Sequence, residues 1–266
     1  MQRFNIISLL VLTMASPYLY AATLPSGDEI ANNINARDEG QSVIRTLTME
    51  MTDKRGKQRV RKTRGFRKYF GDEKRTAIYY LSPKNVKDTA FMIYDYADTT
   101  IDDDQWLYLP AMRKVRRISA ADRGDYFLGT DFTYEDIKLE SKISITDYSR
   151  KTIGEEMIHG HQTYIVESIP IDKETAKELG YSKVKQWVDA EIWIVRKAEF
   201  TNLRNRPLKT IYTREIKQVQ GIWSAHLIEA ENHKTRHTTK FIFSDIDYQT
   251  EVNDDLFTER ALRRGL

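Results

Sequence analysis

The sequence predicts a mainly β protein in which an antiparallel sheet curls around an apolar interior that two or three helices cover. Three observations support this fold class. Short segments of alternating apolar and polar residues recur along the chain, turn residues separate them, and few stretches have helical periodicity. Because a one-sided sheet must bury its apolar face, we expect the helices to cover that face.

The first 22 residues have the layout of a secretory signal peptide. Arg3 precedes an apolar run over residues 4–15, and the small residues Ala21 and Ala22 mark the expected cleavage point. An uncleaved membrane anchor is the alternative, but the run is shorter than the ~20 residues that span a bilayer. We therefore expect residues 23–266 to form a single soluble, exported domain.

The composition excludes several classes of protein. A mean hydropathy of −0.59 with 30% charged residues is typical of a water-soluble chain, and the absence of cysteine excludes disulfides, thiolate sites and lipid attachment through cysteine. The formal net charge of +3 arises from many charges of both signs, which does not resemble a nucleic-acid binder.

The chain carries no recognised catalytic motif. It lacks a G-x-S-x-G elbow, an H-E-x-x-H helix and a glycine-rich phosphate loop. His159 and His161 are spaced to share a strand face, but spacing marks no third ligand. We predict no catalytic activity, no metal and no cofactor.

The first elements after residue 22 are a helix and a half-buried strand. Ser26 and Glu29 form an S-x-x-E capping box, which predicts a helix over residues 27–36. Over residues 43–51 the apolar residues then recur at every second position, as in a strand with one buried face. Arg45 interrupts that face.

Further strands follow at short, regular spacing. A turn at residues 53–56 predicts a hairpin with a basic strand over residues 57–69. Residues 120–139 lose the alternation and form an irregular segment with a helical turn near Thr133, and Asp172 and Gly180 bound a short helix over residues 173–179. The other expected strands cover residues 76–81, 90–96, 105–109, 115–118, 162–169, 184–195, 209–219, 222–231 and 238–248.

Several motifs resemble the outer-membrane lipoprotein-sorting protein family, which is similar to the LolA and LolB carriers. They are DQWLYLPA at 104–111, RKVRRI at 113–118, GTDFTYED at 129–136, KQWVD at 185–189 and DDLFT at 254–258, with Leu262 near the end. The resemblance implies an unclosed half β-barrel whose helices lie over an apolar cavity for acyl chains. It also implies an inner-membrane exporter and an outer-membrane acceptor as partners.

Apolar strand faces supply the candidate cavity residues, with an ordinary packed core as the alternative. Phe127 and Phe132 are candidates for a mobile flap beside Gly124 and Gly129, or for aromatic residues tucked inward from a loop. Arg45 could bind a ligand carbonyl or phosphate, form an internal pair with an acidic residue, or turn outward. The candidate cavity residues are Val43, Arg45, Leu47, Met49, Met51, Phe91, Ile93, Trp106, Tyr108, Ile192 and Ile194.

Two basic runs, over residues 54–68 and 113–117, could dock on an anionic membrane surface or could simply form a solvated sheet face. Together with the apolar strand faces, the resemblance implies a carrier in the periplasm of a Gram-negative cell that moves lipids or lipoprotein acyl chains between envelope membranes. A periplasmic sensor that reports lipids to a membrane partner is the alternative, and an envelope hydrolase is a third hypothesis.

Overall fold

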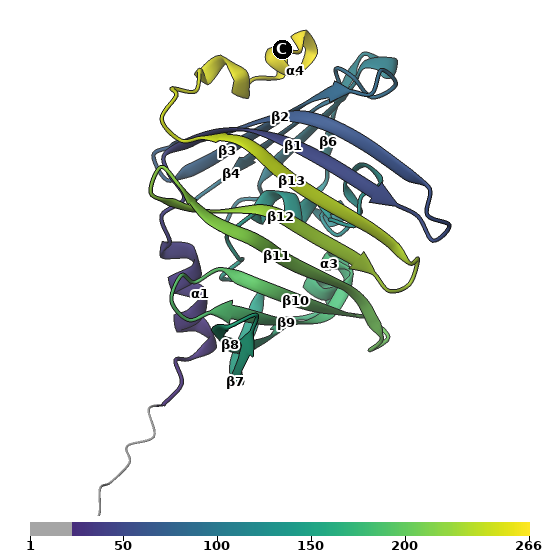
Figure 1. The fold of residues 1–266 in the computed structure, drawn as a ribbon. Coiled ribbons are helices and arrows are strands. Elements are labelled where there is room, and N and C mark those ends of the chain that lie inside the picture. Colours follow the sequence, from purple (N-terminus) through teal and green to yellow (C-terminus); the bar gives the residue numbers. More distant parts are fainter. Residues whose placement is uncertain (1–22) are drawn as a thin grey trace, which may run out of the picture.

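The computed structural model describes residues 23–266, so the expected signal peptide lies outside the described residues. Within them, thirteen antiparallel strands form one sheet in the order β6-β5-β4-β3-β2-β1-β13-β12-β11-β10-β9-β8-β7. The sheet bends strongly but its end strands, β6 and β7, are not neighbours, so the barrel stays open (Figure 1). This confirms the predicted mainly β, unclosed half-barrel.

The strands are β1 (Ser42–Thr52), β2 (Gln58–Phe70), β3 (Glu73–Ser82), β4 (Ala90–Asp95), β5 (Asp104–Leu109), β6 (Lys114–Ile118), β7 (Tyr148–Ile158), β8 (His161–Pro170), β9 (Tyr181–Asp189), β10 (Val195–Asn202), β11 (Pro207–Val219), β12 (Ile222–Asn232) and β13 (His237–Asp247). The α-helices are α1 (Gly27–Ala36), α2 (Tyr134–Leu139), α3 (Lys173–Leu179) and α4 (Glu259–Arg264). Four 3-10 turns complete the elements: η1 (Pro110–Met112), η2 (Ala120–Asp122), η3 (Phe127–Gly129) and η4 (Asp254–Phe257).

One connection decides where the interior is filled. Strands that follow one another in the chain pair as neighbours, except that β1 also pairs with β13 and that β6 and β7 lie at opposite ends of the sheet. Residues 119–147, which we call the crossing segment, join those two ends and contain η2, η3 and α2. The crossing segment lies on the concave side of the sheet, behind β12 and β13 in Figure 1.

The predicted helix boundaries at α1 and α3 are confirmed. Ser26 Oγ accepts the backbone N–H of Glu29 at 3.1 Å, and the α1 residues Ile30 and Ile34 pack against β8 and β9. Asp172 caps α3, which ends at Gly180 with φ +79°. A left-handed backbone favours glycine, which explains why the helix ends there.

The main core lies on the concave face. Aromatic residues of the crossing segment pack there against the strands: the Phe127 ring lies 4.9 Å from that of Phe91, and Phe132 stacks on Phe241 at 4.1 Å. The core also contains Leu47, Met49, Met51, Ile78, Tyr80, Ile93, Leu107, Ile118, Tyr134, Ala230 and Phe243.

A second core covers the convex face of β2 to β6. The chain after β13 folds back over this face, where Val252, Phe257 and Leu262 are buried (Figure 1). The Tyr79 and Tyr94 hydroxyls donate to the backbone oxygens of Leu256 and Phe257, which fixes the path of this C-terminal segment.

The single strand expected over residues 184–195 is wrong. Residues 184–189 belong to β9, residues 190–194 form a turn, and only Val195 belongs to β10, most of which was not predicted. Asp189 stops the ladder, because its carboxylate accepts the backbone N–H groups of Glu191 at 2.9 Å and Ile192 at 3.0 Å. Trp193 then takes a positive φ of +55° in the tight turn. Ile192 therefore belongs to a turn and not to an apolar strand face.

Replacing the buried Phe257 by alanine should destabilise the protein by about 3 to 5 kcal/mol, because the cavity left behind cannot be refilled from the sheet. Urea unfolding would measure the loss, with Leu266→Ala as the control because Leu266 is 61% exposed. A Phe257→Ala variant within about 1 kcal/mol of the parent would show that the C-terminal segment is not part of the core.

Candidate functional site

A cavity of about 230 Å³ remains between the concave face of the sheet and the crossing segment. Pockets for drug-sized ligands are usually ~300–1,000 Å³, so this cavity is just below that range. Apolar side chains from opposite walls converge on it, and they include Leu47, Ile78, Phe132, Ile137, Leu139, Val184, Ile194, Ala198, Phe200, Ile211, Ile228, Phe241, Phe243 and Ile246.

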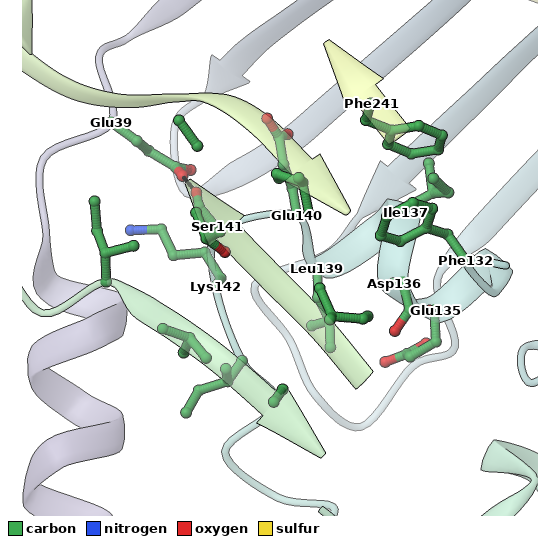
Figure 2. A pocket seen from close by; sticks show the side chains of 18 of the residues that line it. Glu39, Phe132, Glu135, Asp136, Ile137, Leu139, Glu140, Ser141, Lys142 and Phe241 are labelled. Carbon is green, nitrogen blue, oxygen red and sulfur yellow. Dashed lines mark hydrogen bonds between the residues drawn. The ribbon is translucent and has the colours of Figure 1, made fainter. Parts of the chain in front are cut away.

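The inner wall of the cavity is built by α2 and the residues that follow it. Thr133 and Asp136 form a capping box, which fixes the start of α2. Asp136 also pairs with the buried ammonium group of Lys209, which lies 4.8 Å from the centre of the Phe200 ring. These contacts turn Ile137 and Leu139 toward the cavity (Figure 2).

The opposite end of the cavity is polar. Figure 2 shows Glu39, Ser141 and Lys142 gathered beside the chain that follows α1, away from Phe132 and Phe241. The Glu39 carboxylate pairs with Arg67 at 3.0 Å and accepts the hydroxyl groups of Tyr69, at 2.5 Å, and Ser141. The crossing segment is thereby attached to β2 and to the α1–β1 connection.

Charges and hydrogen bonds keep Glu39 ionised. Burial alone would raise its pKa, but the positive charges of Arg67 and Lys74 and the hydrogen bonds from Ser141 and Tyr69 outweigh burial and lower the pKa to about 2. The folded protein therefore favours the carboxylate form over a wide pH range.

Arg45 lines the cavity and forms an ion pair with Glu140, at the end of α2. Its guanidinium lies 4.7 Å from the centre of the Phe243 ring. The sequence left three possibilities for Arg45: contact with a ligand, an internal ion pair or an outward orientation. In the structure Arg45 forms the internal ion pair, with Glu140.

Glu135 is a second buried carboxylate at the cavity. Burial raises its pKa, although Lys138 at 3.1 Å and Arg123 at 3.9 Å act in the opposite direction. Arg123 also pairs with Asp147 and Glu178, so the two ends of the crossing segment share one ionic network.

Only part of the predicted cavity set lies at the cavity. Arg45, Leu47 and Ile194 line it, as does the flap candidate Phe132. Trp106 and Tyr108 instead pack on the convex face, where alternation along β5 turns them away from the cavity, and Ile192 lies in the β9–β10 turn. Five further candidates belong to the packed core of the concave face and do not line the cavity: Met49, Met51, Phe91, Ile93 and Phe127. Val43 is buried but does not line the cavity either.

Apart from Arg45, the residues at the polar end of the cavity were not predicted from the sequence. Arg37 and Glu39 follow α1 in a charged run that is typical of a solvated loop, and Glu140, Ser141 and Lys142 belong to an irregular stretch. No local pattern signals that the two segments meet. The walls from β11 and β12 were expected as strands, but not as part of the site.

The histidines do not gather into a metal site. His159 lies in the β7–β8 turn with φ +49°, whereas His161 begins β8, so the two do not share a strand face. In residues 23–266, no three His, Asp or Glu side chains are placed to hold a metal ion. No helix in this part of the chain is long and apolar enough to cross a membrane.

Lowering the pH should weaken folding through Glu39. An unfolded glutamate has a pKa near 4.5, so the depressed folded pKa contributes stability above that value, and this contribution is lost as the pH falls toward 2. Over this range the stability advantage of the parent over Glu39→Gln should shrink by about 3 kcal/mol in urea unfolding. The exposed Glu155→Gln is the control, and a difference between parent and Glu39→Gln that does not change with pH would contradict the account.

A search of the curated proteins found no match to the chain. A family model with the description "Uncharacterized protein" matches residues 72–264. Among solved structures, a LolA superfamily protein from Nitrosomonas europaea has 20% identity and a TM-score of 0.66 over 89% of this chain and 99% of that chain, which shows the likeness of fold.

Two solved structures are more similar in sequence. A DUF1329 family protein from Desulfovibrio piger has 27% identity and a TM-score of 0.81 over 89% of this chain and 97% of that chain. A domain described as an outer membrane lipoprotein-sorting protein, from Vibrio parahaemolyticus, has 33% identity and a TM-score of 0.80 over 90% of this chain and 98% of that chain. The chain therefore belongs to the outer membrane lipoprotein-sorting protein family.

Proposed function

We propose that the protein is a periplasmic carrier that binds acyl chains of lipids or lipoproteins in its cavity and transfers them between envelope membranes. The observation that carries the proposal is the incompletely filled concave face: apolar side chains from β1, β11, β12 and β13 meet an empty volume instead of one another. Protein interiors are otherwise close-packed, so a void of this size is unusual.

The energetics of transport favour such a cavity. Each exposed methylene costs about 0.8 kcal/mol in water, so a chain of ~16 carbons meets a barrier on the order of 12 kcal/mol unless a protein shields it. A carrier must also release the chain, which a loosely filled cavity permits. At about 230 Å³ the cavity would have to widen for a long chain. The crossing segment is the wall that would have to move, and it is held by the ion pair between Arg123 and Asp147 and by the hydrogen bond from Ser141 to Glu39.

Binding suits the site better than catalysis. Each carboxylate that lines the cavity forms an ion pair with a cationic side chain of the protein, so none is left without a charged partner. These carboxylates are Glu39, Glu135, Asp136 and Glu140. A hydrolase would need a nucleophile and a base that converge on one point of the cavity. The name of the Vibrio relative and the LolA-like fold support the same choice.

Protein purified from the periplasm should contain acyl lipids, which mass spectrometry of an organic extract would detect. Ile228→Trp fills the cavity and should remove most of the lipid, whereas Val60→Trp, on an exposed strand position, should not. Circular dichroism would check that both variants fold. Equal lipid content in folded Ile228→Trp and parent would refute the cavity as the binding site.

A carrier must also deliver its cargo. Lipid-loaded protein mixed with acceptor vesicles should lose a fluorescent fatty acid to the vesicles, and the rate should rise with vesicle concentration if delivery requires contact. Retention of the lipid without transfer would contradict a carrier and would favour the sensor, which needs only to bind.

A further inference from the structure

The polar end of the cavity carries more positive charge than its own residues neutralise. Four cationic side chains line this end, Arg37, Arg45, Arg67 and Lys142, whereas the carboxylates there are Glu39 and Glu140. Glu39 pairs with Arg67 and Glu140 pairs with Arg45. Arg37 and Lys142 are left with no carboxylate in salt-bridge distance among residues 23–266.

The contacts of Arg37 leave it undersatisfied. Its Nη1 donates to the backbone oxygen of Trp223 at 3.5 Å and its Nη2 to that of Ser141 at 3.3 Å, both at the long end for a hydrogen bond. Its buried Nε has no hydrogen-bond partner within the described chain. Burial lowers the pKa of Arg37, and the nearby Glu39 and Glu140 carboxylates act in the opposite direction without outweighing burial.

Lys142 lies next to Arg37. Its ammonium group donates to the backbone oxygens of Asn35 at 2.6 Å and Arg37 at 3.0 Å, which are among the last carbonyls around the end of α1. An ammonium has three donors, so one remains. Burial lowers the pKa of Lys142, and the positive charges of Arg37, Lys74 and Arg67 lower it further, while Glu39 acts in the opposite direction.

We propose that Arg37 and Lys142 form a binding site for the anionic headgroup, phosphate or carboxylate, of the amphiphile whose acyl chain occupies the cavity. The inference rests on the proposed function and adds the class of cargo to it. An anion here would accept charge-assisted hydrogen bonds from donors that no side chain uses. The apolar wall formed by Leu47, Ile211 and Phe241 belongs to the same cavity, so one molecule can satisfy both regions.

The position of the pair agrees with a headgroup site. Arg37 and Lys142 are partly exposed, and the neighbouring Trp223 is 37% exposed, whereas the far end around Phe132 is buried. A chain that enters from this side places its charged end last, at the boundary with water. A neutral headgroup would leave the two cations unpaired.

Titration calorimetry with delipidated protein tests the inference through three probes: dodecyl phosphate, neutral monolauroylglycerol and inorganic phosphate. The double variant Arg37→Gln/Lys142→Gln should bind dodecyl phosphate about tenfold or more weakly than the parent, because it loses charge-assisted hydrogen bonds to the phosphate. Its affinity for monolauroylglycerol should not change. Arg55→Gln/Lys57→Gln removes two exposed charges from the β1–β2 turn and is the matched control.

The outcomes separate the headgroup site from the proposed function. If both amphiphiles bind and the double variant weakens neither or both equally, the headgroup site is refuted and the cavity stands. If neither amphiphile binds the folded parent, the proposed function itself fails. Inorganic phosphate that binds as tightly as dodecyl phosphate would overturn the headgroup assignment in favour of a free anion. Should the double variant not fold, Arg37→Gln and Lys142→Gln each give the same test singly.

Discussion

The structure depends on one constraint: an open sheet of thirteen strands must bury its concave face, and the connection between its two end strands supplies much of the cover. Residues 119–147 cross from β6 to β7 through the interior and fill it well around Phe127 and Phe132. Beyond α2 the segment becomes polar, with Glu140, Ser141 and Lys142. Its side chains do not fill the space under the sheet there. The first part of the segment therefore belongs to a packed core, and the part after α2 lines a cavity.

Apolar contacts hold the first part of the crossing segment, and ion pairs and hydrogen bonds hold the rest. Glu39, Arg67 and Ser141 join it to the α1–β1 connection and β2, Arg45 pairs with Glu140, and Arg123 ties its beginning to its end. Breaking a buried pair by removing one partner is costly, so these contacts determine where the wall of the cavity lies. The wall consists of residues that are attached by charge at several points but packed on one side only.

The sequence determined the fold class well, and it determined the site only in part. Alternation predicted most strands, and end signals predicted α1 and α3, because these are local effects of backbone geometry. The strand over residues 184–195 failed because one carboxylate, that of Asp189, closes a turn that the apolar pattern hides. β7 was missed because its exposed, polar sequence lacks a buried face, and β10 was missed beyond Val195. Leu47 lines the cavity, whereas Met49 belongs to the packed core and does not line it. This difference depends on where the crossing segment packs, and the alternation of residues along a strand carries no information about where another segment will pack.

The most direct test of an incompletely filled concave face is a methyl NMR titration of the delipidated protein with dodecanoate. The account predicts that signals of Leu47, Ile211, Ile228 and Ile246 shift together and saturably, while those of the packed residues Ile93 and Met49 change little. Shifts confined to exposed methyl groups such as those of Ile153 and Met157 would contradict it, because they would place the acyl chain outside the half-barrel.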